Sequence, residues 1–327
     1  MVHVVDSHEH EVPEHIYSFV EQLLKSTDTG SENIVLSVML GGAHSKRLEN
    51  SRSDVDLTMY YTTNARNLIS FNRKTLAIVP KDRFHQTKTE PVLYEWRGNL
   101  YELETVPSRR VGEGNDLFDN LRKCNMHTIH ALLKDYLVAV GIAPVWSREF
   151  DRLIGIFRDD EYDLSIEAIV GYFRGYMKSQ LQSHRRRSDF GKREMKAWKT
   201  YDPSPVVKAI MNGMYIGLSG IFLLDERSVS RDFHKLWERY EYLFTEKEQE
   251  FVEQCYRHKT YKKHITKHVD QFLADSAKQR DSIFKKLENQ FDISKGLALR
   301  DGRFKIETDH KKNNSILDEF QYRFLGL

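Results

Sequence analysis

The sequence predicts an α+β protein, with a mixed sheet and helices in its N-terminal part and helices alone in its C-terminal part. Stretches of β character occur only before Gly114, and apolar residues recur at helical spacing after it. A length of 327 residues suits two ordinary domains. We expect a first domain at residues 1–145, a helical domain at 146–300 and a C-terminal tail at 301–327.

Four stretches of the first domain have the pattern of β-strands. They are residues 33–40, 54–61, 92–96 and 100–106. The first is an apolar run, and the second alternates polar and apolar side chains with a period of two. Arg97, Gly98 and Asn99 separate the last two strands and tolerate the backbone of a tight turn, which predicts a β-hairpin. A helix is predicted before the strands at 13–25, where Pro13 suits a first helical turn.

The pattern after Gly114 is that of helices. The predicted helices cover residues 116–140, 165–183, 204–224, 231–242 and, with breaks, 246–291. Ser204 and Pro205 suit an N-cap and a first helical position. The most apolar stretch, 209–224, is too short for a typical membrane span, so we expect a buried helix and no membrane partner. The last residues, 301–327, have weak periodicity and are expected to form a mobile or docked tail.

The composition excludes several classes of protein. Lys and Arg number 50 against 48 Asp and Glu, so the net charge of +2 excludes a chain that binds polyanions over its whole surface. The two cysteines, Cys124 and Cys255, are too few for a disulfide scaffold or a thiolate zinc site, and they suit a reducing compartment. The N-terminal residues show no basic-then-apolar targeting signal. We therefore expect a cytoplasmic protein.

Basic residues are nevertheless concentrated in two segments. From Arg174 to Lys199 there are nine Lys and Arg but only two acids, a net charge of +7. The aromatic residues interleaved with this segment are Tyr172, Tyr176, Phe190 and Trp198. A second cluster runs from Arg257 to Lys267 without an acid. Cations with interleaved rings suit contact with a phosphate backbone and stacking on bases, so these segments predict a polyanionic partner. A solvated helix face is the alternative.

The segment between the first two predicted strands carries the clearest chemical signal. The first strand ends at Gly41 and Gly42, and the second begins with Asp54 and Asp56. Carboxylates two residues apart on a strand project from one face and repel each other unless a cation lies between them. Such hard oxygen ligands suit Mg²⁺ or Mn²⁺, and a glycine turn lets backbone N–H groups approach a phosphate. The basic residues Lys46 and Arg47 lie between the two elements.

This arrangement resembles the polymerase-beta superfamily of nucleotidyltransferases. Its signature is Gly-Ser, a short spacer and Asp-x-Asp, commonly preceded by Ser. Gly42 and Ala43 take the Gly-Ser positions, and Ser53, Asp54 and Asp56 take the Ser-Asp-x-Asp positions. Within the superfamily the segment is most similar to the predicted nucleotidyltransferases associated with RNA ligases. The resemblance covers about residues 34–133 and extends more weakly to 206–224, and it implies a polymerase-beta-like head.

The resemblance implies a site for two metals in which Asp54 and Asp56 are ligands and a third carboxylate on a neighbouring strand completes the set. Glu102 and Glu104 are the two candidates for the third carboxylate. We favour Glu104, because its distance to the following helix fits the family layout better. The residues expected to contact a nucleoside triphosphate such as ATP are Gly41, Gly42, Ala43, Ser53, Lys46 and Arg47.

Two positions depart from the family pattern. Ala43 replaces the serine whose hydroxyl usually contacts a phosphate, and Arg47 stands where the family often has glycine. The expected reaction moves a nucleoside monophosphate from a nucleoside triphosphate to a hydroxyl and releases pyrophosphate. The resemblance favours an RNA end as the acceptor. Transfer to a small molecule or to a protein hydroxyl, and a catalytically silent nucleic-acid binder, are the alternatives.

Overall fold

The computed structural model has an α+β fold, and the chain divides into two compact units. The first unit comprises Met1–Lys46, Ser53–Asp163 and Thr308–Leu327, and the second comprises Arg47–Arg52 and Leu164–Glu307. The residues that the structure describes are 3–5, 12–26, 33–49, 53–63, 92–96, 99–107, 117–134, 136–137, 144–158, 161–198, 201–261 and 269–325.

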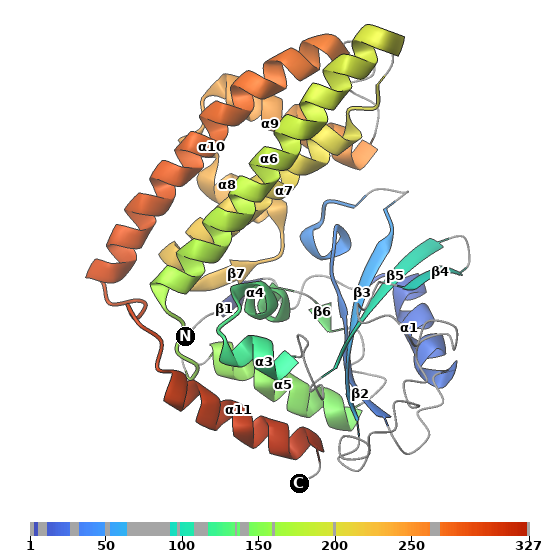
Figure 1. Cartoon of the computed structure of the whole chain (residues 1–327), viewed down its shortest axis with the longest axis vertical. Helices are drawn as coiled ribbons and strands as arrows, with labels where there is room; N and C mark the ends of the chain where they lie inside the picture. Colours follow the sequence, from blue (N-terminus) through green and yellow to red (C-terminus); the bar gives the residue numbers. More distant parts are fainter. Residues whose placement is uncertain are drawn as a thin grey trace. The chain divides into compact units, whose positions relative to one another are not determined.

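The first unit contains a five-stranded mixed sheet with the strand order β4-β5-β3-β2-β6 (Figure 1). Its strands are β2 (Asn33–Leu40), β3 (Val55–Thr63), β4 (Val92–Trp96), β5 (Asn99–Pro107) and β6 (Tyr136–Leu137), and a short β1 (His3–Val5) precedes them in the chain. Strand β3 pairs antiparallel with β2 and parallel with β5, while β4 and β5 form the predicted antiparallel hairpin. The turn residues Arg97 and Gly98 lie outside the described residues.

Helix α1 (Glu14–Ser26) packs on one face of this sheet. Its buried residues are Ile16, Phe19, Val20 and Leu23, and they meet Val38, Leu40, Val55, Leu57, Met59, Tyr101 and Leu103 of the strands. The ring of Phe19 stacks on that of Tyr101 with the centroids 3.8 Å apart. Successive side chains of a strand point to opposite faces, so the polar residues that alternate with this core project from the face away from α1.

Four further helices of the described residues belong to the first unit: α3 (Leu117–Arg122), α4 (Met126–Lys134), α5 (Pro144–Arg158) and α11 (His310–Leu325). Helix α5 packs on β2, so the first unit extends to Asp163 rather than to the expected boundary at 145. The sequence pattern predicted no helix at these residues and placed most of them in the helical domain. The packing partner of α5 is set by the tertiary structure.

The C-terminal segment, expected to be a mobile or docked tail, forms the helix α11 and belongs to the first unit. Asn313 of α11 is fully buried; its Oδ1 accepts a hydrogen bond from the Asp163 N–H (2.8 Å), and its Nδ2 donates to the Asp163 carbonyl (3.0 Å). Two of the buried α11 positions, Asn313 and Gln321, are polar and two, Leu317 and Phe320, are apolar. This mixture explains why the apolar periodicity of the segment is weak.

The second unit is built from helices α6 (Ile166–Trp198), α7 (Ser204–Glu226), α8 (Phe233–Tyr240), α9 (Glu246–Tyr261) and α10 (Val269–Arg300), with a short β7 (Ser228–Ser230). Helices α6, α7 and α10 pack against one another (Figure 1). Gly213 and Gly220 allow this close packing, since a Cβ on either would lie 2.4 Å from a ring atom of Phe284 or Phe291 on α10. The N-cap of α7 is Pro203, one residue before the expected Ser204.

Helix α7 is the one helix of the described residues that is long and apolar enough to cross a membrane. Of its most apolar 18-residue window, 83% is buried inside the protein. The buried side chains lie against α6, α8, α9 and α10. Its apolar character is therefore accounted for by its position as the core helix of the second unit.

The start of α9 is held by a buried carboxylate. Glu248 accepts hydrogen bonds from the N–H and the hydroxyl of Thr245 (2.7 and 2.9 Å), and it also contacts Ser282 and Lys286 of α10 at 2.5 Å each. The bond from the Thr245 N–H to Glu248 is the glutamate half of a capping box, and two residues of another helix extend it. Burial by itself would raise the pKa of Glu248, but the hydrogen bonds from Lys286, Ser282 and Thr245 outweigh it and lower the pKa to about 2.

We predict that Glu248 makes folding stability depend on pH. Because its folded pKa is depressed, its contribution is present above the ordinary value of 4.5 and is lost as the pH falls towards about 2. Glu248→Gln should lower the free energy of unfolding at neutral pH by about 2 kcal/mol. It should also flatten the loss of stability below pH 4.5, as measured by urea unfolding.

The matched control is Glu250→Gln, which changes an exposed glutamate of the same helix. It should leave both the stability at neutral pH and its dependence on acid nearly unchanged. Equal pH profiles for wild type and Glu248→Gln would contradict the proposed role of the buried carboxylate.

Candidate functional site

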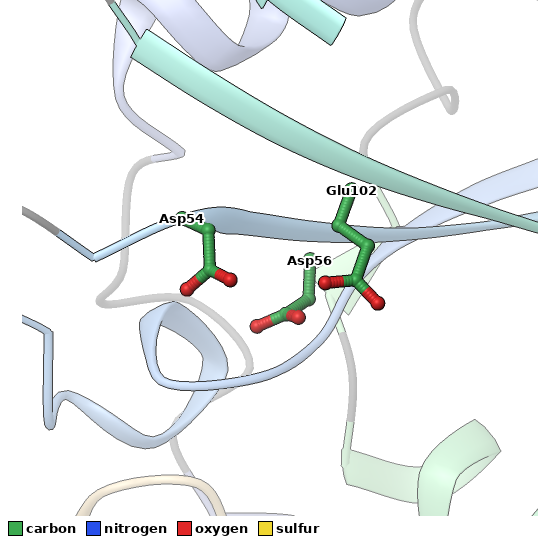
Figure 2. Close-up of side chains that lie close together, drawn as sticks. All are labelled: Asp54, Asp56 and Glu102. Carbon is green, nitrogen blue, oxygen red and sulfur yellow. The ribbon is translucent and has the colours of Figure 1, made fainter. Parts of the chain in front are cut away.

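Three carboxylates converge on the face of the sheet away from α1. Asp54 and Asp56 come from the beginning of β3, and Glu102 comes from β5. Each offers one carboxylate oxygen, and these three oxygens all lie within 4.8 Å of one another. Figure 2 shows the three carboxylates pointing to the same side of the two strands. All three residues are half-buried, so the cluster is open to a ligand on one side.

The register between β3 and β5 decides which glutamate joins the pair. Asp56 lies opposite Glu102, and Thr58 lies opposite Glu104, in this parallel pairing. The structure therefore brings Glu102, and not the favoured Glu104, next to the two aspartates. Glu104 is exposed and lies two residues farther along the strand, which is about 6.6 Å. Both glutamates share one face, so alternation alone could not separate them.

The glycine turn lies directly against the acidic pair. Gly42 has a φ of +62°, and a Cβ built on it would lie 1.5 Å from Oδ2 of Asp56 and 2.4 Å from Cγ. The N–H of Gly41 donates a hydrogen bond to the carbonyl of Asp56 (2.9 Å). Only glycine combines this positive φ with the space that the Asp56 carboxylate occupies. The backbone of the turn and the carboxylates thus form one continuous surface.

The turn continues as a short 3₁₀ helix, His44–Lys46. The N–H of Ser45 donates to the Gly41 carbonyl (3.1 Å), and the N–H of Lys46 donates to the Ala43 carbonyl (3.1 Å). Within the described part of the chain, the N–H groups of Gly42 and Ala43 make no hydrogen bond. Consecutive free N–H groups in a turn can bind an anion such as a phosphate oxygen.

Ser45 is a residue of this turn that sequence reasoning missed. It is fully buried, and its hydroxyl donates a hydrogen bond to the Gly42 carbonyl (3.2 Å). Its role is to hold the turn closed three residues after Gly42. The spacing of a serine three residues beyond a glycine turn is the signal that could have identified it. Ala43, the residue at the expected serine position, is half-buried and has no hydroxyl.

The structure gives Arg47 a different partner from the expected phosphate. Its guanidinium contacts Asp232 Oδ2 at 2.6 Å within the second unit. Asp232 is the N-cap of α8, and its Oδ1 accepts a hydrogen bond from the His234 N–H (2.8 Å). Arg47 is thus engaged by a buried carboxylate, which the spacing of neighbouring residues could not reveal. Lys46 and Ser53, the other two candidates in this segment, are half-buried.

The basic segments are only partly described. Helix α6 carries the first segment from Arg174 to Trp198. In the second, Arg257 pairs with Glu253 of the same helix, and residues 262–267 lie outside the described residues.

The three carboxylates fit a hard divalent cation. They offer oxygen ligands only, from two hydrogen-bonded strands, and such a set suits Mg²⁺ or Mn²⁺ better than a metal that prefers nitrogen or sulfur. The three negative charges also repel one another in the absence of a cation. Compared with models of known protein families and with curated proteins, the sequence has no match.

We predict that Gly42→Ala destabilises the protein by about 2–5 kcal/mol, the sum of a positive-φ cost and a clash with Asp56. Gly302→Ala is the matched control, because Gly302 has a φ of +63° and nothing within 4 Å of an added Cβ. It should cost only about 1–2 kcal/mol. Urea unfolding of both variants without added metal measures the difference.

A double-mutant cycle assigns the extra cost to the contact itself. Asp56→Ala removes the two nearest atoms, Oδ2 and Cγ, so Gly42→Ala should cost less in that background than in the wild type. Purely additive effects would show that the close approach of the turn to Asp56 is not what constrains residue 42.

Proposed function

We propose that the protein is a metal-dependent nucleotidyltransferase. It would transfer a nucleoside monophosphate from a nucleoside triphosphate to an acceptor hydroxyl and release pyrophosphate. The observation that carries this proposal is the convergence of Asp54, Asp56 and Glu102 beside the Gly42 turn. Acidic oxygens for a cation and free N–H groups for phosphate lie next to each other there, and the reaction needs both. The resemblance of the same segment to the polymerase-beta superfamily points to the same chemistry and to a polymerase-beta-like head.

Each group of the site has a role in this reaction. A Mg²⁺ or Mn²⁺ ion held by the three carboxylates would neutralise charge on the phosphates. The N–H groups of Gly42 and Ala43 would hold the phosphate oxygens of the nucleotide. Glu102 would orient the acceptor hydroxyl and take its proton. The acceptor oxygen bonds to the α-phosphorus, the bond from this phosphorus to the bridging oxygen breaks, and pyrophosphate leaves with that oxygen.

We favour a polynucleotide end, RNA in the first place, as the acceptor. The basic character of α6 supports this choice over a small molecule or a protein hydroxyl. The acidic cluster argues against a catalytically silent nucleic-acid binder, because three converging carboxylates repel a phosphate backbone unless a cation is bound. A cytoplasmic location suits the two cysteines, which are both free and buried.

We predict that Asp54→Asn, Asp56→Asn and Glu102→Gln each reduce transfer by about a hundredfold or more. Glu104→Gln is the matched control and should stay near the wild-type rate, because Glu104 lies outside the cluster. The assay supplies each labelled nucleoside triphosphate with Mg²⁺ or Mn²⁺ and a mixture of RNAs, and it locates the label. Chelation of the metal should abolish transfer.

Two results would count against the assignment. Wild-type rates in Asp54→Asn or Asp56→Asn would remove these residues from the reaction. Label found on a small molecule or on a protein, with none on RNA, would replace the polynucleotide acceptor by one of the alternatives while leaving the transfer chemistry in place.

A further inference from the structure

The second unit has an open pocket on α6, with a volume of about 670 Å³. Its lining residues are Arg186, Asp189, Phe190, Lys192 and Arg193. Arg186, Phe190 and Arg193 follow the spacing i, i+4 and i+7, so they share one side of the helix. From Arg186 to Arg193 the helix rises about 10 Å, so the cations are spread along this side of the helix.

The cations of this pocket have no anionic partner among the described residues, unlike two other cations of α6. Arg174 pairs with Asp292, and Arg185 pairs with Asp281 at 3.4 Å. Arg186, Lys192 and Arg193 form no ion pair with any residue that the structure describes, and all three are exposed. The pocket therefore has three positive side chains and one negative side chain, Asp189. Its net charge is positive, so it attracts anions.

An exposed ring lies among these charges. Phe190 is 49% exposed, although a large apolar side chain gains free energy from burial. One side of it meets the ring of Tyr201 in an edge-to-face contact with the centroids 6.1 Å apart. Tyr201 donates a hydrogen bond to the Arg187 carbonyl (3.3 Å). Its ring packs against Gly191, where a Cβ atom would lie only 2.5 Å from the ring. Phe190 is thus supported on one side and open on the other.

We propose that this face of α6 binds a single-stranded nucleic acid. Arg186, Lys192 and Arg193 contact successive phosphates, and one base stacks on Phe190. Stacking on an open ring requires an unpaired base, which a duplex does not offer. Asp189 is a hydrogen-bond acceptor for a base amino group or a ribose hydroxyl within the same pocket. The surface requires no transferase activity, so it can be tested independently of the acidic cluster.

The contribution of the charges is tested by measuring binding to fluorescent oligo(U) and oligo(dT) at several salt concentrations, with fluorescence anisotropy as the readout. The triple variant R186A/K192A/R193A should bind more weakly, and its slope of log K against log salt should be smaller by about 2 units. The control K247A/K285A/K311A removes the same net charge from exposed lysines elsewhere. It should keep the wild-type slope. An equal slope in wild type and the α6 variant would overturn the proposal.

The stacking contribution is tested separately. Phe190→Ala should weaken binding to oligo(U) about tenfold, and Phe190→Trp should retain it. An abasic strand should bind wild type and Phe190→Ala equally, because it has no base to stack. A duplex or an anionic vesicle that binds as tightly as the single strand, with the same sensitivity to these variants, would overturn the assignment to single strands. Thermal unfolding confirms that each variant is folded.

The two proposals fail in different ways. Asp54→Asn should bind the single strand as wild type does, while it loses transfer. If the α6 variants lose strand binding and the wild-type protein shows no transfer, the binding surface is supported and the transferase proposal is rejected. If transfer to RNA is normal and strand binding is unchanged by the variants of Phe190 and of the α6 cations, the transferase is supported and the proposed binding surface is rejected.

Discussion

The close approach of Gly42 to Asp56 is the constraint on which the candidate site depends. The turn after β2 and the carboxylate on β3 share a space that a single Cβ atom would fill. The Gly41 N–H bound to the Asp56 carbonyl holds the two segments at that distance. As a result, free N–H groups of the turn lie beside an acidic pair without any side chain between them. Such an arrangement lets a phosphate and a cation bind next to each other.

Strand β3 can carry these charges because its other face is buried. Repulsion between two carboxylates about 5 Å apart is on the order of 1–3 kcal/mol at a partly exposed site. Each large apolar side chain buried beneath α1 contributes about 1.5–3 kcal/mol, and the core under the sheet contains eleven buried residues. Burial therefore outweighs repulsion, and the sheet holds the acids together even before a cation binds.

The helical unit uses its charges in two ways. Two cations of α6, Arg174 and Arg185, pair with Asp292 and Asp281 of α10, and these pairs lie beside a packed interface. Towards the end of α6 the cations Arg186, Lys192 and Arg193 have no such partners among the described residues, and Phe190 is exposed between them. Packing accounts for the first arrangement. Packing does not explain the exposed ring and the unpaired cations near the end of α6, so this surface points to a ligand.

Features that follow from local geometry were predictable from the sequence. Strand alternation put Asp54 and Asp56 on one face, the glycine turn followed from the end of an apolar run, and the hairpin followed from its turn residues. The pairing of β3 with β5 places Glu102 rather than Glu104 beside the aspartates, and this register depends on contacts between distant segments. The tertiary structure likewise gave Arg47 its partner Asp232 and placed α11 in the first unit. Contacts between residues far apart in the chain leave no spacing pattern in the sequence.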